Sequence, residues 1–164
     1  MPYPADSGTR IRVARIVSAL RGRHDVTVLS LEAGDADGAA RALGVPVAVH
    51  PARPRRGLAP VAVAPETTAA IWEAARAWRA DAVHLQGTFS AAAAALHRER
   101  PGVPAVADEA CVHHLSYRRA AALAPSALAR ARGRMRSWRL RRFEAGLARR
   151  ATAVVAVSED EAAL

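Results

Sequence analysis

The chain has 164 residues, a formal net charge of +9 and a single cysteine, Cys111. This length fits one domain, and one cysteine excludes a disulfide scaffold within the chain. No apolar run reaches the roughly 20 residues needed to cross a bilayer. The N-terminus, with Pro2, Pro4 and Asp6, also lacks the charged and then apolar pattern of a signal peptide. We therefore expect a cytoplasmic protein.

The excess positive charge is concentrated in one segment. All 24 basic residues are arginine, and nine of them lie between Arg130 and Arg150 together with one acid, Glu144. The rest of the chain is almost neutral. The exclusive use of arginine, with abundant alanine, indicates a GC-rich genome. No nucleic-acid-binding motif or aromatic stacking surface accompanies the charge, which makes nucleic acid an unlikely partner.

The first half of the chain alternates helix-like and strand-like runs. Short apolar runs rich in β-branched residues are typical of buried parallel strands, and apolar positions three to four residues apart are typical of helices. The expected elements are a helix over 7–23, strands over 25–31 and 45–50, a proline-rich loop over 51–65, and a helix over 66–79. The apolar stripe of the last helix is expected at Ile71, Ala74, Ala75 and Trp78.

The second half continues the alternation. Strands are expected over 81–86, closed by Gly87, over 103–108 and over 153–157. Helices are expected over 88–100, over about 115–150 with a break near Pro125, and from 158 onward. The apolar positions of the long helical region, expected to pack on the sheet, are Leu128, Ala131, Met135, Trp138, Phe143 and Leu147. This order predicts an α/β, Rossmann-like fold, with a parallel sheet and helices on both of its faces.

The two ends do not match a whole domain of this kind. A doubly wound sheet normally begins with a central strand that leads into the first loop, but here a loop leads directly into a helix. The chain also stops about one turn into its last helix. We expect residues 1–164 to form one truncated domain that lacks its first strand.

The loop at the start of the first helix is a candidate anion site. Small residues at a helix N-terminus present free backbone N–H groups and the positive end of the helix dipole, which suit a phosphate. The residues concerned are Ser7, Gly8, Thr9 and Arg12. The alternative is an ordinary turn in which Asp6 or Ser7 caps the helix.

Four collinear segments resemble one family. They are PYPADSGTRIR at 2–12, ADAVH at 80–84, DEACVHHLSYRR at 108–119 and RFEAGLARRATAVVAVSE at 142–159. In this order they are similar to the N-terminal domain of the retaining GT-B glycosyltransferases called group 1, or family four. The resemblance implies an acceptor-side domain over 1–164, and it assigns the sugar nucleotide to a C-terminal domain that this sequence does not contain.

The same resemblance implies a set of site residues. The loop around Ser7, Gly8 and Thr9 would lie against the donor phosphates, and Arg10 or Arg12 would either add positive charge there or be solvated. The acceptor side of the cleft would be formed by Gln86, Gly87, Asp108 and Glu109. Family members commonly have a histidine directly after the Asp-Glu pair, where this chain has Ala110. Either His113 or His114 takes over that catalytic position, or the site is altered or inactive. A polar loop without any role is the simpler interpretation of both histidines.

The expected function is transfer of a hexosyl-type sugar from a nucleotide-sugar donor to a sugar, lipid or small-molecule acceptor, with retention. By resemblance, no metal or other cofactor is needed, and the isolated chain is expected to be inactive. The alternative is a non-catalytic binding module or a decayed remnant whose basic helix docks on an acidic partner or membrane. That helix offers a basic surface at Arg132, Arg136 and Arg139, suited to peripheral contact with the inner membrane face or simply solvated.

Overall fold

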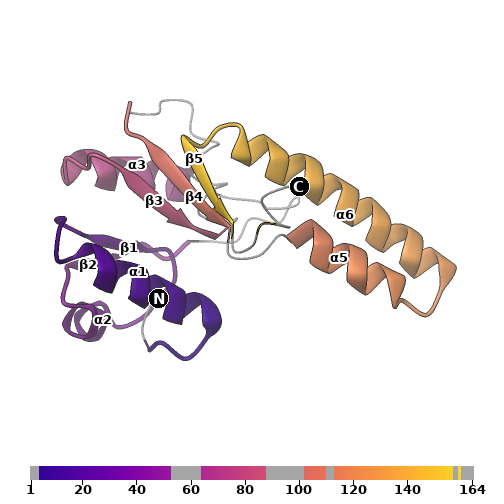
Figure 1. Ribbon diagram of the computed structural model, residues 1–164, viewed down its shortest axis with the longest axis horizontal. Coiled ribbons are helices and arrows are strands. Elements are labelled where there is room, and N and C mark those ends of the chain that lie inside the picture. The colour runs from indigo at the N-terminus through magenta and orange to yellow at the C-terminus, as the bar shows by residue number, and fades with distance from the viewer. Residues whose placement is uncertain (1–3, 53–63, 88–101, 110–112, 157–158, 160–164) are drawn as a thin grey trace. The chain divides into compact units, whose positions relative to one another are not determined.

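The computed structural model describes residues 4–52, 64–87, 102–109, 113–156 and 159 (Figure 1). These residues belong to two compact units. The first unit contains residues 4–52 and 64–80, and the second contains the described residues from 81 onward. Each unit is an α/β arrangement with a parallel sheet of its own.

The first unit alternates helices with two strands. Its elements are α1 (Gly8–Leu20), β1 (Val28–Ser30), α2 (Ala36–Leu43), β2 (Val47–Val49) and α3 (Pro65–Ala77). Strands β1 and β2 are parallel, with Val28 opposite Val47 and Ser30 opposite Val49. The apolar core joins Val17 of α1 to Leu43 and Val45, and Val28 and Val47 pack against them. The helix and strands predicted for this part of the chain are confirmed.

Helix α2 was not anticipated from the sequence, although its end signals are present. The Asp35 carboxylate accepts a hydrogen bond from the Gly38 N–H at 2.9 Å and so caps the first turn. At the other end Gly44 has a φ of 67° and terminates the helix in the left-handed conformation. An aspartate followed nine residues later by a glycine is a usual pair of helix start and stop signals.

Helix α3 lies where it was predicted, but its buried face differs from the expected one. Trp72 is fully buried beside Ile71 and Ala75, whereas Trp78 is exposed. Trp78 ends the helix, and Arg79 follows with a φ of 52°. The chain therefore leaves the helix before Trp78 can join the buried stripe, and the prediction that placed it there is wrong.

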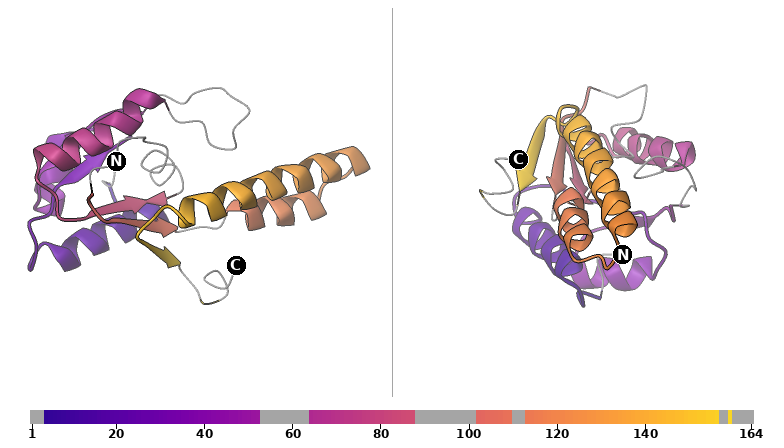
Figure 2. Two further views of the ribbon diagram at one scale, coloured as in Figure 1. Left: turned by 90° about the horizontal axis from the view of Figure 1, so that it is seen from above. Right: turned by 90° about the vertical axis from the view of Figure 1, so that its right-hand side faces the viewer.

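The second unit contains a three-stranded parallel sheet and two long helices. Strands β3 (Val83–Gln86), β4 (Ala105–Glu109) and β5 (Ala153–Ala156) lie in the order β3-β4-β5. Helices α5 (His113–Ala122) and α6 (Ala127–Ala148) are joined by a short turn. Figures 1 and 2 show these helices side by side, extending beyond the strands of their unit. We call this pair the α5–α6 hairpin.

The predicted alternation of strands and helices is thus confirmed, including the break near Pro125. The strands fall into two parallel sheets, β1-β2 and β3-β4-β5. The helix expected over 88–100, most of the loop over 51–65 and most of the segment from 158 onward lie outside the described residues, as do Ala110 and Cys111.

The face of α6 that is buried is not the predicted one. Leu128, Met135 and Trp138, expected to pack on the sheet, are 60%, 64% and 58% exposed. The buried residues of the helix are Ser137, Leu140 and Leu147. Of the predicted apolar positions, Leu147 is therefore buried, whereas Leu128, Met135 and Trp138 face solvent. The reason is that α6 packs against α5 on the side that carries Gly133 and Ser137.

Gly133 allows this close packing. A Cβ atom at Gly133 would lie 2.5 Å from the Cβ and 3.1 Å from the Cα of Ala121 in α5. Gly146, in the same helix, has no such neighbour within 4 Å. The closest approach of the two helices therefore depends on the absence of a side chain at position 133.

These two glycines provide a matched test. We expect Gly146→Ala to raise the free energy of unfolding by up to about 1 kcal/mol, because alanine is the better helix former. Gly133→Ala gains the same propensity but forces α5 and α6 apart, so we expect a net loss of about 1–2 kcal/mol. Urea denaturation followed by circular dichroism measures both. Equal stabilisation by the two substitutions would contradict the close contact at Ala121.

Candidate functional site

The candidate residues at the start of α1 belong to the first unit. Ser7 has an extended backbone, with a φ of −134°, and its hydroxyl accepts a hydrogen bond from the Arg10 N–H at 3.5 Å. Ser7 is therefore the N-cap of the helix, as the simpler interpretation predicted. No atom lies within 4 Å of the position that a Cβ would take at Gly8, which leaves open space in front of the helix.

The charges near this turn are partly balanced within the protein. The Arg10 guanidinium lies 2.9 Å from the Asp6 carboxylate and 3.5 Å from that of Glu32. Its charge is thus compensated by two acids. The groups of this turn that suit an anion are its backbone N–H groups, because the first N–H groups of a helix have no carbonyl partner within the helix. Binding of a phosphate by Ser7, Gly8, Thr9 and Arg12 stays a prediction.

The acceptor-side candidates lie in the second unit, where β3 and β4 end. Gln86 is the last residue of β3 and pairs in register with Asp108 of β4. Gly87 follows with a φ of 78° and turns the chain away from the strand. Glu109 ends β4 and pairs with Ala156 of β5. The structure therefore brings all four residues to the carboxyl edge of one parallel sheet, where α/β proteins usually bind ligands.

Asp108 and Gln86 differ in how their polar groups are satisfied. Asp108 is only 1% exposed, and its carboxylate lies 3.5 Å from Nε2 of His84 on the neighbouring strand. The amide of Gln86 is also shielded from water, but neither its Nε2 nor its Oε1 has a hydrogen-bond partner among the residues that the structure describes. A buried amide without a partner costs about 1–3 kcal/mol. In native proteins such a group usually has an explanation in a functional role, in stored strain or in a bound water or ion.

The two histidines proposed for catalysis lie at the start of α5, where Glu144 of α6 binds both. Its carboxylate oxygens accept hydrogen bonds from the backbone N–H of His113 at 2.9 Å and from that of His114 at 3.4 Å. One oxygen also lies 2.6 Å from Nδ1 of His114. The side chains of His114 and Glu144 are 8% and 12% exposed. Glu144 therefore acts as the N-terminal cap of α5 from another helix.

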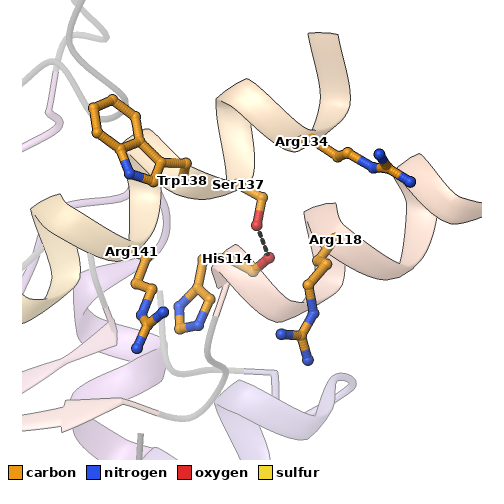
Figure 3. A pocket seen from close by; sticks show the side chains of 6 residues that line it. All are labelled: His114, Arg118, Arg134, Ser137, Trp138 and Arg141. Atoms are coloured by element: carbon orange, nitrogen blue, oxygen red, sulfur yellow. Dashed lines mark hydrogen bonds between the residues drawn. The ribbon is translucent and has the colours of Figure 1, made fainter. Parts of the chain in front are cut away.

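His114 is also held from its carbonyl side. The Ser137 hydroxyl donates a hydrogen bond to the His114 carbonyl oxygen at 2.8 Å, as Figure 3 shows. These contacts give His114 a structural role, and a catalytic role for His113 or His114 stays a prediction. The sequence analysis missed Glu144 as a functional residue. The available signal was its position as the sole acid among the nine arginines of residues 130–150.

A pocket of about 340 Å³ opens between α5 and α6 (Figure 3). It is lined by His114, Arg118, Arg134, Ser137, Trp138 and Arg141. Two arginines outside the pocket rest on aromatic rings of the hairpin: Arg136 lies 4.3 Å from the ring centre of Tyr117, and Arg142 lies 5.1 Å from that of Trp138. The predicted basic surface of Arg132, Arg136 and Arg139 is exposed on α6, as expected.

The described part of the chain contains neither a cluster of metal-ligand side chains nor a membrane-spanning helix. Within it, no group of three or more His, Cys, Asp or Glu side chains is placed to hold a metal ion. Among the same residues, no helix combines the length and the hydropathy that a membrane span requires.

Comparison with known proteins identifies the family. The family model described as a Glycosyl transferase 4-like domain matches residues 7–164. Because this match covers nearly the whole sequence, the chain belongs to the glycosyl transferase 4-like family and is a glycosyltransferase domain. Neither the curated proteins nor the solved structures contain a significant match.

The cap at the start of α5 can be tested by removing its charge. We expect Glu144→Gln to lower the free energy of unfolding by about 1–2 kcal/mol, because hydrogen bonds to an ionised acceptor are stronger than neutral ones. Glu73→Gln, at an exposed position of α3, is the control and should change stability by less than about 0.5 kcal/mol. Chemical denaturation followed by circular dichroism provides the comparison. Equal effects would argue against the cap.

Proposed function

We propose that this chain is the acceptor-side domain of a retaining GT-B enzyme that moves a hexosyl-type sugar from a nucleotide-sugar donor to an acceptor. The observation that carries the proposal is the Gln86 amide, buried without a partner beside Asp108, in a chain of the glycosyl transferase 4-like family. A second domain would supply most of the donor site. Such a transfer needs no cofactor besides the donor itself.

The acceptor would bind at the carboxyl edge of β3 and β4. A sugar hydroxyl both donates and accepts hydrogen bonds, so it can satisfy Oε1 and Nε2 of Gln86 at once. Asp108, fixed beside His84, would accept a hydrogen bond from a neighbouring hydroxyl of the acceptor. A site whose polar groups are already desolvated discriminates well between acceptors, because an acceptor without the matching hydroxyl leaves those groups unpaired.

The donor phosphates would meet the start of α1. As the bond between the sugar and the diphosphate breaks, negative charge grows on the leaving oxygen, and fixed donors aimed at that charge lower the barrier. The N–H groups of Gly8 and Thr9, with the positive end of the helix dipole, have this character. Arg12, on the next turn, would add positive charge. Retention of configuration is part of the same proposal.

If the donor site lies mainly in a second domain, this chain should bind nucleotide sugars weakly. For a dissociation constant of 1 mM or more, 1 mM ligand stabilises the folded state by at most about 0.4 kcal/mol. We therefore expect UDP- and GDP-sugars at 1 mM to raise the melting temperature by no more than about 2 °C. Differential scanning fluorimetry measures the shift. A rise of 5 °C or more would mean that a complete donor site lies within residues 1–164.

Transfer itself can be tested in a chimera. Residues 1–164 are joined to the donor domain of a family-four glycosyltransferase whose donor is known, and labelled donor is offered with cell extracts as the acceptor source. We expect a labelled product that the parent enzyme does not make. Gln86→Met should abolish that product while donor binding persists. It should also raise the free energy of unfolding by about 1 kcal/mol, because a buried unpaired amide is removed.

The outcomes separate the competing functions. A folded chimera that binds donor but labels no new acceptor would contradict the acceptor-domain proposal and favour a non-catalytic module. If Gln86→Met keeps full transfer, the acceptor lies elsewhere on the domain. A loss of stability in Gln86→Met would show that the amide has a partner.

A further inference from the structure

The α5–α6 hairpin carries far more positive charge than its own acids can balance. Residues 113–150 contain eleven arginines and one acid, Glu144. That carboxylate is already bound to the backbone of His113 and to the backbone and ring of His114. The hairpin's own acid therefore cannot balance its arginines.

Three of these arginines line the pocket. Arg118 comes from α5, and Arg134 and Arg141 come from α6, seven residues apart and so on one face of the helix. Figure 3 shows Arg118 and Arg141 extending toward the same side of the pocket, with His114 between them. None of the three forms an ion pair with a carboxylate of the described residues. A guanidinium group without an ion-pair partner is suited to binding a phosphate, because two of its N–H groups can donate to two phosphate oxygens at once.

Large apolar side chains lie on the same outward surface. Leu128, Met135 and Trp138 are more than half exposed, and their spacing of seven and three residues places them on one stripe of α6. By helical spacing, Arg134 and Arg141 flank this stripe on the pocket side and Arg132 and Arg139 on the other. Leu123, in the turn at the tip of the hairpin, is 86% exposed.

We infer that the α5–α6 hairpin is a docking surface for an anionic lipid bilayer, with a lipid headgroup phosphate in the pocket formed by Arg118, Arg134 and Arg141. A helix with an apolar stripe between rows of arginine lies in the plane of a bilayer interface, with its apolar side chains in the acyl boundary. Trp138 combines an apolar ring with a polar N–H, the character of residues at that depth.

The same observations argue against the other polyanions. A nucleic acid would satisfy the arginines but would leave Leu123, Leu128 and Met135 in water or against charge. An acidic protein would need an apolar groove matched to this stripe, whereas any anionic bilayer presents phosphate and hydrocarbon close together. This inference goes beyond sugar transfer and does not depend on it, since the surface lies on α5 and α6 and the proposed acceptor site at the ends of β3 and β4.

The test is binding of the purified chain to vesicles of phosphatidylglycerol and phosphatidylcholine, with pure phosphatidylcholine vesicles for comparison. We expect sedimentation with the anionic vesicles only, and a blue shift of the fluorescence of Trp138, identified by its loss in Trp138→Phe. Each arginine near an anionic surface strengthens binding about five-fold. The triple variant that carries Arg118→Gln, Arg134→Gln and Arg141→Gln should therefore have a vesicle partition coefficient that is lower by on the order of 100-fold.

A matched variant separates the pocket from general charge. This control carries Arg15→Gln, Arg41→Gln and Arg76→Gln, which remove the same charge from exposed positions of α1, α2 and α3. This control should weaken binding by less than about five-fold. If both triple variants lose binding equally, the pocket has no special role. The replaced side chains are all exposed, and circular dichroism checks that each variant folds.

Two more results would overturn the inference. One is the absence of sedimentation with anionic vesicles. The other is release of the bound chain by millimolar glycerol phosphate at constant ionic strength, since that result would identify a soluble phosphate ester as the ligand. Retention of the chain by a duplex oligonucleotide, in preference to the vesicles, would assign the surface to nucleic acid instead.

Discussion

The second unit depends on one carboxylate. Glu144 holds the first turn of α5 by two backbone hydrogen bonds and fixes the ring of His114 at 2.6 Å. The α5–α6 hairpin would otherwise be two arginine-rich helices that repel each other. Gly133 and Ser137 also contact α5, and this packing leaves Arg134 and Arg141 to line the pocket. Glu144 thus contributes to the packing of the hairpin on which the pocket depends.

Much of the fold follows from local sequence pattern. The runs over 25–31, 45–50, 81–86, 103–108 and 153–157 each contain a strand, because short β-branched apolar runs suit parallel sheets buried on both faces. What the pattern could not supply was the orientation of the helices. For α6 the apolar periodicity pointed to Met135 and Trp138, yet its buried residues are Ser137, Leu140 and Leu147, and Gly133 lies against Ala121 of α5.

The candidate site was predicted to a similar extent. Family resemblance located Gln86 and Asp108, and strand register explains why they lie together at one edge of the sheet. The missing hydrogen bond of the Gln86 amide could not be inferred from sequence, since it depends on what surrounds the strand end. Likewise the structural partner of His114 could not be inferred from the sequence. Only the fold brings Glu144, thirty residues along the chain, to its ring.

The division of the strands into two sheets has a consequence for assembly. In the described residues, β1 pairs only with β2, and β3 only with β4. Among these residues, each of the two strands therefore has one edge whose N–H and C=O groups no neighbouring strand satisfies. Such an edge can accept an extended segment of suitable register, from this chain or from a second copy of it.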